Sequence, residues 1–395
     1  MLGDAAMEFA PSPAEEAFRA SVREWLSAHV PTEPYPADAG ARVQYARRWA
    51  RTMYDGGWAG LAWPAEYGGR DLSPLEHLIF AEEYAAAGAP PLIDIGVGPA
   101  LTGPTLIHHG TEEQKRRFLQ PILSGDEVWC QGFSEPGAGS DLAGLQTRAV
   151  LDGDDLVING QKVWTSYARF ADWCILIVRT NPDVPKHKGL TFVLLDMKTP
   201  GITIRPLVEM TGVAWFNEVF FEDVRVPKKY VVGEIDKGWD ITVTTLSVER
   251  GAHNPYPRLV SELQDMIALV KRLADDTPKA ADPRLRQRIA RIATEVHALR
   301  LTVLRSVSET MRKGRPGPEG SILKLMWSEL EQRLMEAASE ISGAYAVLDE
   351  HAPQAIDGGR WQYGLLWSRA ASIYAGTSEV QRNILAQRVL GLPRG

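Results

Sequence analysis

The sequence predicts an α+β protein whose helices and strands are segregated along the chain. Helical periodicity occupies the first third and the last third of the 395 residues. Between them the pattern changes to short β-rich runs separated by Gly, Pro and Asp. Because strands and helices do not alternate, a parallel sheet with crossover helices is not expected. No GxGxxG follows a predicted strand and opens a helix, which disfavours a Rossmann nucleotide site.

The first part of the chain is predicted to be helical. Apolar residues recur at helical spacing over residues 14–29 and 42–55, and a segment rich in Pro separates the two stretches. Ser73–Glu76 combines an N-cap serine, a proline at the first helical position and a capping-box glutamate. Thr111 and Gln114 form a second capping box, so another helix is expected to begin there.

The middle of the chain is predicted to form a β domain. Asn159-Gly160 lies between two β-rich runs, at residues 155–158 and 161–165. This dipeptide predicts a two-residue hairpin turn, because both turn positions require a positive φ. Further runs rich in β-branched and aromatic residues are expected to be strands. They are residues 171–180, 189–197, 201–207 and 216–227.

The last part returns to helical patterns, and the change of period divides the chain into three domains. The predicted helices cover residues 238–273, 283–313, 319–348 and 360–369. We expect an N-terminal helical domain at residues 1–126, a middle β domain at 127–235 and a C-terminal helical bundle at 236–395.

Charge and composition exclude several functional classes. The chain carries 43 Lys and Arg against 50 Asp and Glu, a balance that argues against a nucleic-acid partner. No apolar stretch approaches the ~20 residues of a membrane span, and the N-terminus lacks the pattern of a signal peptide. The two cysteines, Cys130 and Cys174, have no metal-ligand spacing, so no metal is expected. This composition predicts a cytoplasmic protein that does not insert into a membrane.

Three segments carry residues suited to binding a flat, anionic cofactor. Phe133–Ala143 gathers glycines and hydroxyls, which let backbone N–H groups approach a ring or an anion. In Val163–Ser166, a tryptophan beside two hydroxyls can stack on a heterocycle. In Ile373–Asn383, Gly376 breaks the helical pattern, and the next Thr or Ser can cap a new helix. Each segment alone also fits a structural role: a turn, a core tryptophan and a joint between helices.

In this order and spacing, and together with Trp63–Gly69, the three segments resemble the acyl-CoA dehydrogenase family. The resemblance extends from Phe9 to Leu392. It implies an all-α N-terminal domain, a central β-barrel-like domain and a C-terminal four-helix bundle, with FAD between the last two. It also implies an acyl-CoA substrate, an electron-transferring flavoprotein as electron acceptor, and a homo- or hetero-oligomer arranged as a dimer of dimers.

The resemblance assigns roles to individual positions. Trp164 is expected to cover the isoalloxazine, and Ser166 to hydrogen-bond near its N5. The other positions implied in cofactor binding are Phe133, Ser134, Gly139, Ser140, Thr377 and Glu379. The positions implied in substrate binding are Ser140, Arg250 and Gly376.

The position of the catalytic base departs from the common family pattern. Many members carry a glutamate immediately before the Gly-Thr pair of the third segment, where this chain has Ala375. The backbone N–H of Ala375 is still expected to contact the thioester carbonyl. A minority of members carry the base on the first long helix of the C-terminal domain, and Glu249 occupies that position. We therefore expect Glu249 to remove the α proton, with a solvated or ion-paired helix carboxylate as the alternative.

A second departure concerns assembly. Homotetrameric relatives donate an Arg-x-x-Phe-Gly segment and a Gln-x-x-Gly-Gly-x-Gly segment to a neighbour's FAD. Residues 274–288 lack the first, and Glu340–Tyr345 is a degraded form of the second. This pattern resembles actinobacterial dehydrogenases of steroid side-chain breakdown, in which two different subunits share one flavin site. A flavin oxidase or monooxygenase, a non-catalytic partner subunit and an enzyme acting on acyl-carrier proteins remain alternatives.

Overall fold

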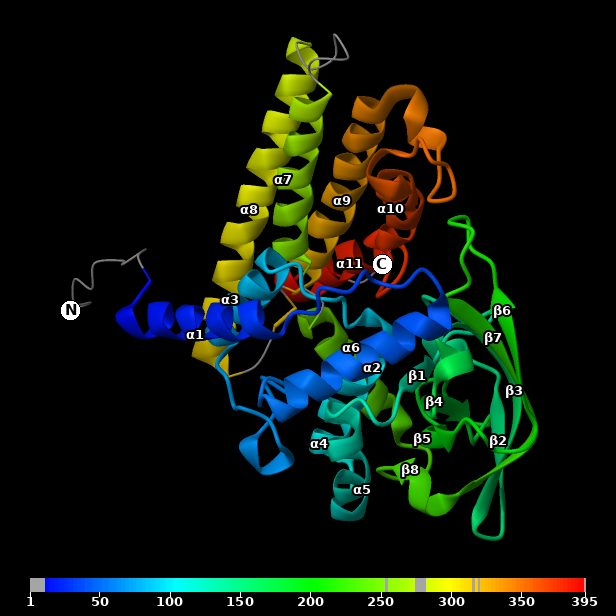
Figure 1. Ribbon diagram of the computed structural model, residues 1–395. Coiled ribbons are helices and arrows are strands. Elements are labelled where there is room, and N and C mark those ends of the chain that lie inside the picture. Colours follow the sequence, from blue (N-terminus) through cyan, green and yellow to red (C-terminus); the bar gives the residue numbers. More distant parts are fainter. Residues whose placement is uncertain (1–10, 253–254, 274–281, 315–316, 319, 394–395) are drawn as a thin grey trace.

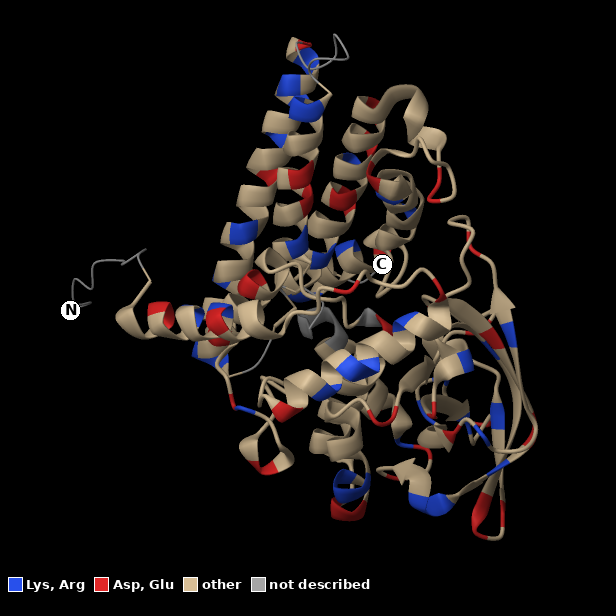
Figure 2. Ribbon diagram, in the orientation of Figure 1, with Lys and Arg blue, Asp and Glu red and all other residues tan. Residues whose placement is uncertain are grey.

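A helical N-terminal region, a central sheet and a helical C-terminal region follow one another along the chain, which confirms the predicted order (Figure 1). The computed structural model describes residues 11–393 except 253–254, 274–281, 315–316 and 319. None of the described helices is both long and apolar enough to cross a membrane. In the view of Figure 2, acidic and basic residues are interspersed along helices and strands.

Local signals set the starts of the N-terminal helices. Capping boxes at Ser73 and Thr111 start two of them as predicted, and Ser12 provides a third. In each box the side-chain oxygen accepts an N–H of the first turn, a group that otherwise lacks a helical partner. The helices of this region are α1 (Pro13–His29), α2 (Ala39–Asp55), α3 (Pro74–Ala86), α4 (Gly103–His109) and α5 (Glu112–Leu123).

The central domain is a mixed, open sheet. Its strands are β1 (Trp129–Gly132), β2 (Arg148–Asp152), β3 (Asp155–Ser166), β4 (Trp173–Arg179), β5 (Leu190–Asp196), β6 (Ile202–Leu207), β7 (Phe216–Pro227) and β8 (Val231–Val232). They are ordered β6-β7-β3-β2-β4-β5-β8, and β1 pairs with β4. The sheet does not close into the barrel that the family resemblance implied. Closure requires the two end strands to pair, but β6 pairs with β7 at one end and the two-residue β8 pairs with β5 at the other.

The prediction of a hairpin turn at Asn159-Gly160 is wrong. These residues lie inside β3, where its register with β7 shifts by one residue. The turn between β2 and β3 instead falls at Gly153-Asp154, and Gly153 has a φ of 63°. Gly160 serves a long-range contact, because a Cβ there would lie 2.6 Å from Oγ1 of Thr147. Long-range pairing therefore overrides the local turn signal.

The C-terminal helices form a bundle beside the sheet, in which α7, α8, α9 and α10 pack together (Figure 1). The predicted helix at 238–273 is two helices, because Pro255 and Pro257 cannot continue a helix. The core of the bundle includes the fully buried side chains of Leu259, Leu334 and Ala337. Burial of each leucine stabilises the fold by about 2 kcal/mol. The helices are α6 (Gly238–Ala252), α7 (Tyr256–Arg272), α8 (Pro283–Lys313), α9 (Gly320–Ser342), α10 (Arg360–Ser368) and α11 (Ser378–Ile384).

Candidate active site

Hydrogen bonds join the first and second predicted segments side by side. The carbonyl of Ser134 accepts the N–H of Val163 at 2.9 Å. Lys162, whose side chain is fully buried, donates from Nζ to the carbonyl of Phe133 at 3.0 Å and to Oε1 of Glu135 at 2.8 Å. The backbone of the first segment is therefore fixed to β3 immediately before the predicted flavin-facing tryptophan.

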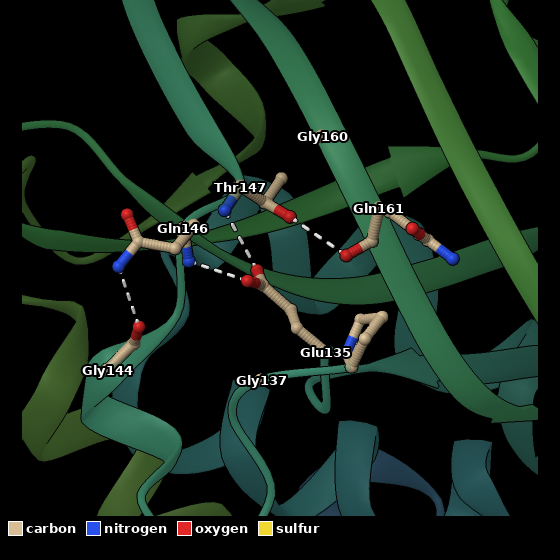
Figure 3. A pocket seen from close by; sticks show the side chains of 8 residues that line it. Glu135, Gly137, Gly144, Gln146, Thr147, Gly160 and Gln161 are labelled. Carbon is tan, nitrogen blue, oxygen red and sulfur yellow. Dashed lines mark hydrogen bonds between the residues drawn. The ribbon is translucent and has the colours of Figure 1, made fainter.

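The Glu135 carboxylate is the centre of this junction. Its oxygens also accept the N–H groups of Gln146, at 2.6 Å, and of Thr147, at 2.9 Å (Figure 3). Burial alone raises the pKa of Glu135, but the Lys162 ammonium and these donors outweigh burial and hold that pKa below its ordinary value. Burial lowers the pKa of Lys162 to about 8, against the opposing attraction of Glu135. The two groups therefore form a charged pair at neutral pH.

Open space lies around the glycines that follow Glu135. A pocket of about 370 Å³ is lined by Glu135, Gly137 and Gly160 among others (Figure 3). A Cβ built on Gly137 or Gly139 would meet nothing within 4 Å. The neighbouring Ser140 is exposed. This loop thus has room for a ligand to approach its backbone, as a glycine-rich cofactor contact requires.

The Phe133 side chain has a different environment from the loop. It is buried, and its ring packs edge-on against Phe192 with 5.9 Å between the ring centroids. Its contribution to the junction is its carbonyl, which Lys162 holds.

Trp164 projects from the sheet at a strained point of β3. Its φ is 60°, it lies where the register between β3 and β7 shifts, and its side chain is 59% exposed. The core-tryptophan alternative therefore does not describe this residue. A left-handed conformation at a bulky residue costs about 1–3 kcal/mol, and such strain is concentrated at functional sites. The half-buried Ser166 ends the same strand two residues later.

Aromatic contacts connect the second segment to the C-terminal helices. The Trp164 ring lies edge-on to Phe216, with centroids 6.0 Å apart. Phe216 in turn stacks on Trp367 of α10, at 6.2 Å and an interplanar angle of 5°. Nearby, the indole N–H of Trp215 donates to the hydroxyl of Tyr363 at 3.0 Å. Trp164 thus lies at the joint between the sheet and α10.

The third segment forms a left-handed loop held by one glutamine. Ala375 and Gly376 have φ values of 52° and 89°. The fully buried Gln381 donates from Nε2 to their carbonyls, at 3.0 and 3.2 Å. In the part of the chain that the structure describes, no acceptor takes the amide N–H of Ala375. The loop therefore offers the unused backbone donor of Ala375, which suits an anionic or polarised oxygen.

The helix start predicted after Gly376 is confirmed. Oγ1 of Thr377 accepts the N–H of Val380 at 3.2 Å, so Thr377 rather than Ser378 caps α11. Thr377 and the exposed Glu379 line a pocket of about 460 Å³ against α9. Hydrogen bonds from the backbone of Glu379 and from Thr377 keep the pKa of Glu379 below its ordinary value.

The backbone of Glu249 and Arg250 lies near the end of α6, while their side chains lie outside the described residues. The described part of α6 is fixed to α4 by side-chain hydrogen bonds. Thr245 and Thr105 share a buried bond of 2.8 Å, and Thr244 bonds Nε2 of His109 at 3.0 Å. The helix that carries the predicted base is therefore anchored to the N-terminal domain.

Lys162, Glu135 and Gln381 hold the predicted segments in place, and the sequence did not predict a role for any of them. Lys162 had one usable signal: it follows the apolar Leu156 and Ile158 at even spacing in a β-rich run, which favours the same face of the strand. Gln381 had none, because a polar residue on a short helix is ordinarily solvated.

Comparisons with known proteins match this chain to one family over nearly its whole length. The family models of the acyl-CoA dehydrogenase N-terminal, middle and C-terminal domains match residues 12–126, 130–224 and 236–390. The acyl-CoA dehydrogenase IpdE1 of Mycobacterium tuberculosis is 41% identical, over 96% of this chain and 98% of its own length.

Two solved structures of relatives superpose along the full fold. The Tcur3481-Tcur3483 steroid ACAD has a TM-score of 0.87 at 31% identity, covering 98% of this chain and 100% of that one. A chain of the ChsE4-ChsE5 complex from Mycobacterium tuberculosis has a TM-score of 0.84 at 33% identity, with the same coverage. With matches to all three domains, this chain belongs to the acyl-CoA dehydrogenase family, a family of flavoprotein enzymes, as its motifs predicted.

Proposed function

We propose that this enzyme binds FAD at the joint between the sheet and the C-terminal helices and forms an α,β double bond in an acyl-CoA thioester. The observation that supports this most is Trp164, a large aromatic side chain held exposed and strained at that joint. FAD fits the surrounding residues. The loop at Gly137 and Gly139 is open, and the amide of Ala375 is unused in the described part of the chain.

The proposed cofactor contacts follow from the chemistry of the residues. Trp164 covers one face of the ring system, and the Ser166 hydroxyl donates near N5. At the nucleotide end, the cap residue Thr377 and Glu379 of α11 take up polar groups of the cofactor. The first segment contributes backbone and hydroxyl donors to the flavin and the thioester, from Phe133, Ser134, Gly139 and Ser140.

FAD, when bound, supplies the hydride acceptor of the reaction. Glu249 removes one proton from the carbon α to the thioester, so the substrate loses that proton and a hydride from the β carbon. Negative charge then develops on the thioester oxygen, and the Ala375 N–H stabilises it; such a donor is typically worth about 10²–10³ in rate. Gly376 leaves room beside the reacting carbons, and Arg250 helps to position the substrate.

The partners proposed for this chain come from its relatives and from its departures from the family pattern. The names of two structural relatives describe a steroid ACAD and a two-component complex. We infer an acyl group on a steroid-like skeleton, a second homologous subunit that completes the flavin site, and an electron-transferring flavoprotein as acceptor.

The test is to produce the chain alone and together with a homologous subunit, measure bound FAD, and add acyl-CoA thioesters without oxygen. We expect full FAD occupancy with the partner and loss of flavin absorbance with steroid acyl-CoA thioesters. Fully loaded protein that no CoA thioester reduces would contradict the proposal, and reduction only by acyl-carrier-protein thioesters would replace the substrate. Rapid reoxidation of the reduced protein in air would indicate an oxidase.

A further inference from the structure

A buried carboxylate lies behind the end of β3 and has no role in the proposed chemistry. Asp94, in the short turn Ile93–Ile95 of the N-terminal region, is only 2% exposed. It accepts hydrogen bonds from the hydroxyls of Tyr35 and Tyr167, one on each carboxylate oxygen. Hydrogen bonds to an ionised group are stronger than those between neutral groups. One carboxylate, that of Asp94, therefore links the segment that contains Tyr35 to the segment that contains Tyr167, although the two are far apart in the sequence.

Tyr167 is the residue directly after Ser166, and the structure fixes it from two sides. Its backbone N–H donates to the carbonyl of Trp215 at 2.8 Å, and its buried phenol donates to Asp94. Its φ is 56°, a left-handed conformation that persists only where the surroundings hold it. Trp164, three residues earlier, has the same left-handed conformation.

The second phenol comes from the N-terminal domain. Tyr35 lies between α1 and α2, and the guanidinium of Arg42 is 5.0 Å from the centre of its ring. The same guanidinium is 4.6 Å from the centre of the Trp215 ring. Burial and Asp94 raise the pKa of Tyr35 and of Tyr167, so both phenols remain donors across the ordinary pH range. The N-terminal domain and the sheet therefore meet at this cluster. The hydrogen bond from Trp215 to Tyr363 connects the cluster to α10 as well.

We propose that Asp94 is a positioning residue for the segment Trp164–Ser166. By accepting the Tyr167 hydroxyl it holds the strained end of β3, and with it the direction in which Trp164 and Ser166 face. The inference rests on the proposed flavin contacts of these two residues. The Tyr35 bond to the same carboxylate fastens the N-terminal domain and does not act on β3 directly.

Two hydroxyl deletions on the same carboxylate form a matched test, Tyr167→Phe and Tyr35→Phe. Three measurements are made on both variants: amide hydrogen exchange of residues 164–168 in FAD-free protein, the Kd for FAD, and the visible spectrum of the bound flavin. We expect Tyr167→Phe to speed exchange at 164–168 roughly tenfold or more, weaken FAD binding by a similar factor and shift the flavin spectrum. Tyr35→Phe should leave all three within about twofold of wild type and speed exchange near residue 35.

The outcomes separate this inference from the proposed function. Equal effects of the two deletions on residues 164–168, or no effect of Tyr167→Phe, would overturn the positioning role. Asp94→Ala should reproduce the hydrogen-exchange pattern of Tyr167→Phe. If Asp94→Ala does not fold, the comparison of Tyr167→Phe with Tyr35→Phe alone decides the positioning role. A wild-type chain that takes up no FAD, with or without a homologous partner, overturns the proposed function and this inference together. Exchange in FAD-free protein then still reports whether the anchor exists.

Discussion

Gln381 offers the sharpest single-residue test of how the third segment is organised. The change Gln381→Leu keeps the side-chain volume similar but removes both hydrogen bonds from Nε2 to the carbonyls of Ala375 and Gly376. Two neutral hydrogen bonds are worth about 1–3 kcal/mol together. The other amide atom, Oε1, has no partner within the described residues, so its loss adds no cost. We therefore expect urea unfolding to show a loss of that size.

The larger effect is expected in the reaction. With its carbonyls released, the loop no longer holds the Ala375 amide in one direction, and a misplaced oxyanion donor costs about 10²–10³ in rate. We expect single-turnover flavin reduction by an acyl-CoA thioester to slow roughly 100-fold, with a smaller change in substrate affinity. Rapid-mixing absorbance measurements without oxygen give both quantities.

Gln114→Leu is the matched control. Gln114 is also buried and also donates from Nε2 to two carbonyls, those of Lys229 and Val231, both at 2.8 Å. It lies on α5, outside the candidate site, so its loss should lower stability at least as much and leave the rate unchanged. If Gln381→Leu were destabilised like this control but reduced flavin at the wild-type rate, the proposed role of the Ala375 amide would be refuted.

Three further predictions concern the Lys162–Glu135 pair and the glycines of the first and third segments. Lys162→Met leaves the buried Glu135 carboxylate without its partner, and we expect urea unfolding to show a loss of about 3–5 kcal/mol; an unchanged midpoint would contradict this. Because burial lowers the pKa of Lys162 from 10.5 to about 8, the folded chain binds fewer protons than the unfolded chain between these values. The stability of wild type relative to Lys162→Met should therefore rise with pH across that window, and a flat difference would show that Lys162 titrates normally. Gly376→Ala, whose Cβ would lie 2.6 Å from Nε2 of Gln381 at a φ of 89°, should lose about 1–3 kcal/mol. Gly137→Ala should show no loss, because its Cβ would meet open space.

The parts of the fold that the sequence predicts are those set by neighbouring residues. Capping boxes at Ser73 and Thr111 and the cap at Thr377 satisfy amides within three or four positions, so the local pattern is sufficient. Asn159-Gly160 failed as a turn because Thr147 and β7 decide its conformation from elsewhere in the chain. The closed barrel expected from the family pattern was wrong for the same kind of reason, because closure depends on long-range pairing between the two end strands.

The candidate site follows the same division. Trp164 and the Gly-Thr loop could be identified because their residue types and spacing suit a cofactor and resemble a family. Their supports could not, because the partners of Lys162 and Asp94 come from other segments of the chain. A lysine or aspartate in isolation predicts a solvated side chain, and only the fold brings its partners near.

The central claim is that Glu249 is the base that replaces the carboxylate missing at Ala375. The most direct measurement is single-turnover reduction of the FAD-loaded enzyme by its acyl-CoA substrate without oxygen, comparing wild type with Glu249→Gln. Binding of the thioester, seen as a shift of the flavin spectrum, serves as the control for an intact site. We expect the variant to bind FAD and thioester as wild type does but to keep its flavin absorbance. Reduction of the variant at the wild-type rate would contradict this role of Glu249 and require another base.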